Sequence, residues 1–137
     1  MRVDSMDNDI RWKQRLENFS KAVKLLEEVQ SLDLRKTSQL EKEGIIQRFE
    51  FTLELGWKTL KDRMESDGLV LNQISPKMVV KEAYKAKYID QIEIWIDMIN
   101  DRNLLRHTYD FTVMEEVISD IQKRYSAALS TLLKTLL

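Results

Sequence analysis

The sequence predicts an all-α protein, an up-and-down bundle of four long helices and one short helix. Apolar residues recur at helical spacing along most of the 137 residues. Only 3 glycines and 1 proline occur, fewer than loop-rich sandwiches or barrels contain. Three positions carry Ser, Asp or Thr with Glu three residues later, the pattern of a helix capping box: Ser38, Asp90 and Thr112. The length fits a single domain over 1–137, with residues 1–10 as a flexible N-terminal tail.

The first two helices follow from one apolar stripe each. The first is expected over residues 11–30, and its stripe comprises Trp12, Leu16, Phe19, Val23 and Leu26. A polar connector over 31–37 separates it from the second helix, which begins after Ser38, with Glu41 completing the capping box. The second helix is expected to end at Ser66 and Asp67, because Gly68 suits the left-handed position that follows a helix.

The second helix has more apolar residues than one face needs. Ile46, Phe51 and Leu55 lie off its main stripe, so this helix is expected to be buried on several sides or to sit at an oligomer interface. Gly44 and Gly56 each cost about 1 kcal/mol relative to Ala inside a helix. We interpret both as positions where another helix crosses closely.

Three more helices follow, one short and two long. Ser75 and Pro76 start the short helix, as N-cap and first-turn proline. Asp90 with Glu93 is expected to open the fourth helix. Thr112 with Glu115 is expected to open the last one, whose apolar stripe continues almost to the C-terminus.

Composition excludes several classes of function. With 22 Lys and Arg against 23 Asp and Glu, the net charge is -1, so binding nucleic acid through bulk positive charge is not expected. The chain has no cysteine and 1 histidine, which argues against disulfides and against a zinc site. Residues 1–10 lack the apolar core of a signal peptide, and no run is long enough to span a membrane. A cytoplasmic protein without metal or cofactor is predicted.

One segment, residues 101–110, concentrates the side chains that could perform chemistry. On a continuous helix Arg102, Arg106 and Tyr109 share a face, while His107 lies about 140° from Arg102. The start of the next helix requires this one to end nearby, and such an end can turn His107 back toward Arg102. Imidazole can act as a base near neutral pH, and guanidinium binds phosphate and stabilises charge on it. Together they suit cleavage of RNA without a metal.

The same residues also fit a purely structural role. A histidine near a helix end is commonly a surface residue, and Arg102 and Arg106 could pair with Asp97 and Asp101. Two other charged groupings are interpreted as solvated helix faces: the acidic strip Asp90, Glu93, Asp97 and Asp101, rather than a magnesium site, and the basic set Lys77, Lys81, Lys85 and Lys87, rather than a patch for nucleic acid or an acidic partner. The row Glu50, Glu54 and Lys58 is interpreted first as favourable pairing along one helix and second as a contact surface.

A family resemblance adds to this interpretation. Arg102, His107 and Tyr109 reproduce the R-x4-H-x-Y motif of HEPN-domain proteins of the HepT type, the helical partners of minimal nucleotidyltransferases. Residues 49–60, 75–77 and 95–103 resemble the subgroup called nucleotidyltransferase substrate-binding proteins. The similarity extends over about residues 16–125, and no departure from the motif predicts inactivity.

The resemblance implies a specific activity and specific partners. HEPN proteins form homodimers that bring two motifs together, and many are metal-independent ribonucleases, which would make Arg102 and His107 catalytic. In HepT pairs a nucleotidyltransferase neutralises the toxin by transferring nucleotide to the motif tyrosine, here Tyr109. Arg106 lies in the variable stretch of the motif and is not required by the family, but its charge makes it, with Asn103, a candidate for phosphate binding. The alternative is a non-catalytic subunit that binds nucleotide or substrate for the transferase.

Overall fold

The computed structural model describes residues 2–137, with side chains from residue 9 onward, and its regular elements are all helical in this range. The helices are α1 (Arg2–Glu27), α2 (Gln39–Ser66), α3 (Pro76–Lys85), α4 (Ile92–Leu105), α5 (Phe111–Asp120) and α6 (Ser126–Leu136). Two 3-10 turns (Glu28–Ser31 and Leu34–Lys36) connect α1 to α2, and a π turn (Ile121–Tyr125) joins α5 to α6. The predicted all-α bundle is confirmed, with α5, the π turn and α6 together forming its last long helix.

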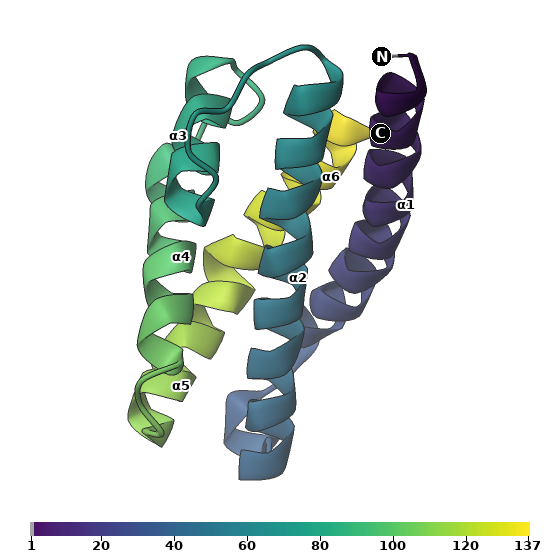
Figure 1. Cartoon of the computed structure of the whole chain (residues 1–137). Coiled ribbons are helices and arrows are strands. Elements are labelled where there is room, and N and C mark those ends of the chain that lie inside the picture. The colour runs from purple at the N-terminus through teal and green to yellow at the C-terminus, as the bar shows by residue number, and fades with distance from the viewer. Residues whose placement is uncertain (1) are drawn as a thin grey trace.

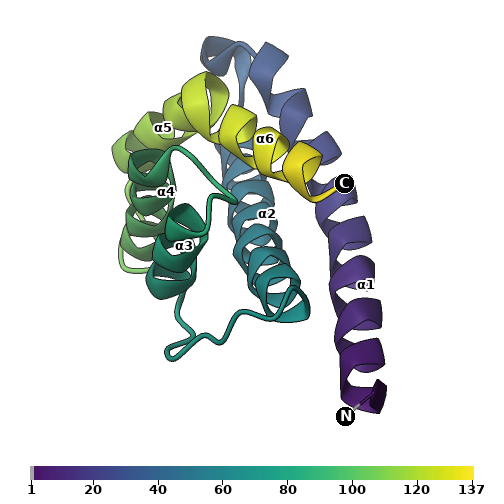
Figure 2. The ribbon, with the colours of Figure 1, turned by 90° about the horizontal axis from the view of Figure 1, so that it is seen from above.

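The helices form two layers. Helix α2 lies between α1 on one side and α3 with α4 on the other, while α5 and α6 run obliquely across one face of this layer (Figures 1 and 2). This arrangement places the end of α4 beside the middle of α2. No helix within the described residues combines the length and apolar character that crossing a bilayer requires.

The first helix begins earlier than the sequence indicated. Because α1 starts at Arg2, residues 2–10 of the expected flexible tail belong to the helix, while Met1 lies outside the described residues. The expected start near Arg11 came from the apolar stripe, which begins only at Trp12. A helix can extend beyond its packed stripe where no residue breaks it.

Helix α2 ends as predicted at both termini. Ser38 accepts a hydrogen bond from the Glu41 backbone, and the Glu41 side chain accepts one from the Ser38 backbone. At the other end Gly68 adopts φ 96°, and the N–H of Leu69 donates to the carbonyl of Met64 at 2.9 Å. These contacts form a Schellman motif, which a residue with a side chain would strain.

Two predicted capping boxes are wrong, whereas the Ser75 cap of α3 is confirmed. Helix α4 has Gln91 at its N-cap, without a side-chain hydrogen bond, in place of Asp90 with Glu93. Helix α5 is capped by Asp110, which accepts from the backbone N–H of Thr112 at 2.8 Å. The carboxylate of Asp110, and not the hydroxyl of Thr112, therefore accepts from a backbone N–H in the first turn of α5 that has no partner within the helix.

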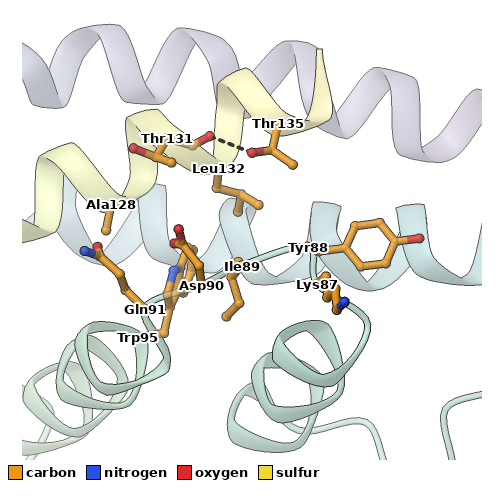
Figure 3. A pocket seen from close by; sticks show the side chains of 10 residues that line it. All are labelled: Lys87, Tyr88, Ile89, Asp90, Gln91, Trp95, Ala128, Thr131, Leu132 and Thr135. Atoms are coloured by element: carbon orange, nitrogen blue, oxygen red, sulfur yellow. Dashed lines mark hydrogen bonds between the residues drawn. The ribbon is translucent and has the colours of Figure 1, made fainter.

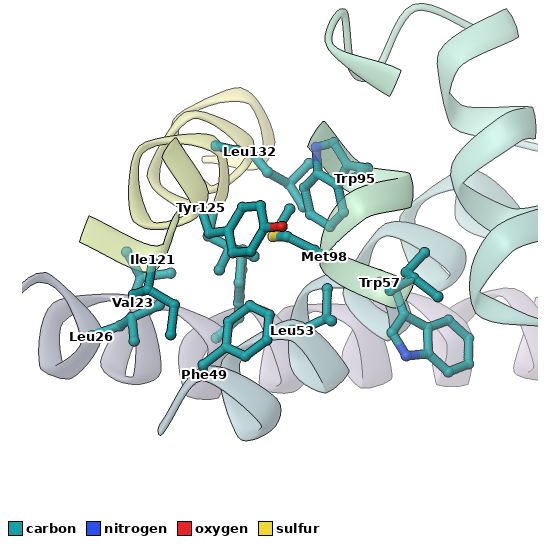
Figure 4. Close-up of a cluster of buried hydrophobic side chains, with 14 of the residues drawn as sticks. Val23, Leu26, Phe49, Leu53, Trp57, Trp95, Met98, Ile121, Tyr125 and Leu132 are labelled. Carbon is teal, nitrogen blue, oxygen red and sulfur yellow. The ribbon is translucent and has the colours of Figure 1, made fainter. Parts of the chain in front are cut away.

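The core lies where α2 meets α1 and the α5–α6 layer (Figure 4). At its centre the rings of Phe49 and Tyr125 stack with centroids 5.5 Å apart, and both residues are fully buried. Trp57 and Trp95 are also buried, at the side of α2 that faces α4. This packing fixes α4 against α2 and so fixes the side chains at the end of α4.

The two helical glycines of α2 have different surroundings. A Cβ at Gly56 would lie 3.1 Å from Phe19 Cε1 and 3.3 Å from Leu129 Cδ2, so the close crossing predicted there is confirmed. A Cβ at Gly44 would meet no atom within 4 Å. The same prediction is therefore wrong for Gly44 within the chain, because no helix of the described residues crosses α2 at this position.

Candidate active site

The candidate site lies at the C-terminal end of α4. The helix ends at Leu105, and the N–H of His107 donates to the carbonyl of Leu104 at 3.0 Å, closing the last turn. The chain then turns through 106–110 into α5. The partial negative charge of a helix C-terminus favours cations, which suits the arginines at this end.

Arg102 reaches from α4 to α2. It is buried, with 4% of its surface exposed, and its Nη1 donates to Oε2 of Glu54 at 2.7 Å. Its Nε donates to Oδ1 of Asn103 at 3.4 Å. The structural alternative, in which Arg102 pairs with Asp97 or Asp101, is not what the structure contains, since Glu54 is its ionic partner.

Glu54 is in turn held by two neighbours on its own helix. Nε1 of Trp57 donates to Oε2 at 3.0 Å, and Nζ of Lys58 lies 3.0 Å from Oε1. Burial alone would raise the pKa of Glu54, but the hydrogen bonds from Lys58 and Trp57, with the charges of Lys58 and Arg102, outweigh it and lower the pKa. Glu54 is therefore ionised at neutral pH, as its pairing requires.

Beside this pair runs an open groove of about 770 Å³ along the outer face of α2. Arg106 lines it and makes no ion pair with any described residue. Glu50 lies one helical turn from Glu54 in the same groove, and burial raises its pKa, although the charges of Arg106 and Arg102 partly oppose this shift. The groove is lined by Gly44, Gln47, Arg48, Glu50, Phe51, Glu54 and Arg106.

His107 is exposed in the turn after α4, and its side chain makes no hydrogen bond with a described residue. The structure thus brings Arg102 and Arg106 close to Glu50 and Glu54 of α2, and it leaves the imidazole on the surface, five residues after Arg102. Asn103 is exposed and contacts Arg102 through the hydrogen bond described above. The imidazole of His107 is therefore accessible from solvent.

Tyr109 is 74% exposed, and its hydroxyl donates to Oε1 of Glu43 on α2. Its ring packs edge-on against Phe111, with centroids 5.5 Å apart. A second groove of about 370 Å³ runs between this ring and α2, and it shares Gln47 and Glu50 with the larger groove. The hydroxyl is therefore held at the surface, in the groove that Glu43 and Glu50 also line.

The opposite side of α4 carries a separate polar network. Arg124 of the π turn donates to Asp97 at 2.9 Å and to Asp120 at 3.2 Å, and the Tyr125 hydroxyl donates to Asp101. Burial raises the pKa of Asp101, with the charges of Asp120 and Asp97 acting in the same direction against the Tyr125 hydrogen bond and the Arg124 charge. Burial and the Asp101 hydrogen bond also raise the pKa of Tyr125.

A smaller hollow of about 160 Å³ lies away from this site, between residues 87–91 and α6 (Figure 3). Asp90, the first member of the acidic strip, lines it together with Trp95. Of the other members of the strip, Asp97 and Asp101 belong to the network of Arg124 and Tyr125, and Glu93 is exposed. Among the described residues, no group of three or more carboxylate or imidazole side chains is placed to hold a metal ion.

The sequence predicts pairing along the helix for Glu50, Glu54 and Lys58, with a contact surface as the second interpretation. The Lys58–Glu54 pair is present, but Glu54 also binds Arg102 across 48 positions of sequence. Glu43 was not singled out at all. The signal in the sequence is the regular spacing of glutamates along the second helix, together with the apolar residues that lie off its main stripe. This signal does not specify which residue of another helix contacts the glutamates.

Comparisons with known proteins agree on the family and on the fold. The family model described as "Nucleotidyltransferase substrate binding protein like" matches residues 14–137. The probable ribonuclease HepT of Haemophilus influenzae is 33% identical over 70 residues, 49% of this chain and 48% of that protein, so the chain spans about half the length of this relative. A crystal structure of a protein from Thermus thermophilus covers 86% of this chain and 98% of its own, with a TM-score of 0.76 and 29% identity.

Proposed function

The chain belongs to the nucleotidyltransferase substrate-binding protein-like family, and from this premise we propose that it is a metal-independent ribonuclease toxin neutralised by a cognate nucleotidyltransferase. The name of the Haemophilus influenzae relative supports the ribonuclease part of the proposal. The observation that carries it is the end of α4, where a buried guanidinium, an exposed guanidinium and an exposed imidazole lie within six residues of chain, 102–107.

The proposed reaction needs only these groups. His107 removes the proton of a ribose 2′-hydroxyl, and the 2′-oxygen attacks the adjacent phosphorus to form a 2′,3′-cyclic phosphate. The bond from phosphorus to the 5′-oxygen of the next nucleotide breaks, and that oxygen leaves as a hydroxyl after taking a proton from water, while protonated His107 returns its proton to solvent. Arg102 stabilises the negative charge that develops on the phosphoryl oxygens, with Arg106 and Asn103 as further phosphate contacts. The lowered pKa of Glu54 supports this arrangement, because an ionised Glu54 keeps Arg102 in place.

A homodimer is part of the proposal, since two motifs side by side would form one RNA cleft. The outer face of α2 supports it: Phe51 is 62% exposed and Leu40 is 78% exposed, on either side of Gly44. A glycine that costs helix stability without a contact in its own chain suits close approach by a second copy. Sedimentation at increasing protein concentration tests this, and a monomer at all concentrations would contradict it.

Tyr109 is the proposed acceptor of nucleotide from the transferase. Its exposure and the hydrogen bond from its hydroxyl to Glu43 support this role, because an incoming enzyme can reach a hydroxyl held in one orientation. Tyr109→Phe is expected to cleave RNA as the wild type does but to gain no nucleotide when co-expressed with the transferase, as judged by intact mass. A nucleotide on the Phe variant would exclude Tyr109 as the acceptor.

The alternative is a non-catalytic subunit that binds nucleotide or substrate for the transferase. The groove of about 770 Å³ favours it, since it offers the exposed ring of Phe51 to a base and the guanidinium of Arg106 to phosphates. This alternative does not require His107.

The test compares purified wild type with His107→Ala on single-stranded RNA. We expect the variant to lose cleavage by about 100-fold or more, since a general base contributes at least that much. Because the ring is exposed, the circular dichroism spectrum and the unfolding midpoint should not change. Lys134→Ala, a surface change on α6, serves as the matched control and should cleave like the wild type.

Each other outcome selects a different conclusion. Equal cleavage by His107→Ala and wild type would exclude His107 as the base. No cleavage by either protein, with intact mass showing that neither carries a nucleotide, would favour the substrate-binding subunit. Loss of helical content in the variant would instead assign His107 a structural role.

A further inference from the structure

Arg102 presents its guanidinium from inside the protein. Its side chain is 5% exposed, and Glu54 and Asn103 occupy one N–H of Nη1 and the N–H of Nε. A guanidinium has five N–H groups, and Nη2 makes no hydrogen bond with a described residue. Part of the donor fork is therefore anchored and part remains available for a phosphate.

The anchor is itself braced. Trp57 donates to the same carboxylate oxygen of Glu54 that binds Arg102, and Lys58 holds the other oxygen. Trp57 and Lys58 both lie on the next turn of α2, and Trp57 is buried against the core. The carboxylate thus has a position set by its own helix before Arg102 reaches it from α4.

We propose that Glu54 is a positioning residue for RNA cleavage, which fixes the plane of the Arg102 guanidinium so that its free N–H groups face the reacting phosphate. This inference rests on the proposed ribonuclease function. A rotating guanidinium would still attract RNA through its charge, but it would meet the developing transition-state charge in the wrong orientation.

The sign of the expected effect distinguishes positioning from other roles. Glu54 is negatively charged, so it opposes the binding of RNA phosphates near Arg102, its ionic partner. Removing its charge should leave KM unchanged or lower it, while the loss of orientation lowers kcat. A residue that only stabilises the fold would lower kcat in proportion to the folded fraction and leave KM alone.

The experiment measures kcat and KM for cleavage of a single-stranded RNA oligonucleotide of mixed sequence, well below the unfolding midpoint. For Glu54→Gln we expect kcat to fall about 10-fold or more, with KM equal to or below that of the wild type. Glu65→Gln is the matched control, since Glu65 also lies on α2 and pairs with a lysine, Lys61, away from the site. It should leave both constants unchanged.

A second variant keeps the test decisive if Glu54→Gln does not fold. Lys58→Gln removes the ion pair between Lys58 and Glu54 but leaves the contact between Glu54 and Arg102. We expect a smaller fall in kcat than for Glu54→Gln. Unchanged kcat in the folded Glu54→Gln protein would overturn the positioning role while leaving the ribonuclease intact. A rise in KM at constant kcat would also overturn it, and RNA cleavage absent from the wild type would overturn both proposals.

Discussion

The two sides of α4 differ in how completely their polar groups are paired. On the side facing the π turn, Arg124 binds Asp97 and Asp120, and Tyr125 binds Asp101, so carboxylates and donors are matched within the chain. The neighbouring residue of Asp101 points the other way. That residue, Arg102, has one carboxylate partner and donors to spare.

The side facing α2 is the incomplete one. Arg106 lines an open groove without an ion pair among the described residues, and His107 makes no side-chain hydrogen bond there. A matched network stabilises a fold, whereas unmatched donors beside a groove are available to a ligand. The contrast between adjacent residues of one helix therefore separates a structural flank from a candidate functional flank.

Removing the Tyr125 hydroxyl tests the structural flank and has the larger expected effect. Tyr125→Phe keeps the stacked ring but leaves Asp101 without its donor, so the free energy of unfolding should fall by about 1–3 kcal/mol. RNA cleavage per folded molecule should not change. Chemical unfolding measures the stability, and the cleavage rate is measured without denaturant.

The same variant can break the comparison. Should Tyr125→Phe retain full stability and lose cleavage, the π-turn flank would belong to the site. Asp101→Asn in the Phe background is the control, because a neutral amide costs less to bury without its donor than a carboxylate does and is not repelled by Asp97 and Asp120, so part of the stability should be recovered.

The fold could be predicted from the sequence because its signals are local. The capping box of Ser38 with Glu41 and the left-handed Gly68 are each decided within a few residues, and both hold in the structure. The boxes at Asp90 and Thr112 failed because a cap depends on where the incoming chain turns. At α5 the carboxylate of Asp110 accepts the hydrogen bond from the backbone N–H of Thr112, so Asp110 is the N-cap.

The sequence indicates a candidate segment for the site, but it does not predict which residues of other helices contact that segment. The segment 101–110 was identified from its residue types, yet the partner of Arg102 came from another helix, 48 positions away. The spacing of Glu50, Glu54 and Lys58 along α2 indicates a common face and says nothing of which helix it meets. Cross-helix pairs depend on the packing of Phe49, Trp57 and their neighbours, which only the tertiary structure supplies.

The two glycines of α2 extend the comparison from polar groups to packing, with a smaller expected effect. Gly56→Ala should destabilise the protein by about 1 kcal/mol, because a methyl group 3.1 Å from Phe19 outweighs the better helix propensity of Ala. Gly44→Ala should stabilise the isolated chain by up to about 1 kcal/mol, because its methyl group meets nothing. Chemical unfolding at low protein concentration measures both.

Self-association should respond in the opposite sense to chain stability at Gly44. If a second copy packs against the outer face of α2, the added methyl group occupies its place, and Gly44→Ala should weaken the dimer in sedimentation experiments although the chain itself is more stable. Gly56→Ala is the internal control, since its contacts lie within the chain. A Gly44→Ala protein that associates like the wild type would show that no second copy packs against this turn of α2. Gly44 and Gly56 would then differ only in that Gly56 packs against Phe19 and Leu129 while Gly44 faces solvent.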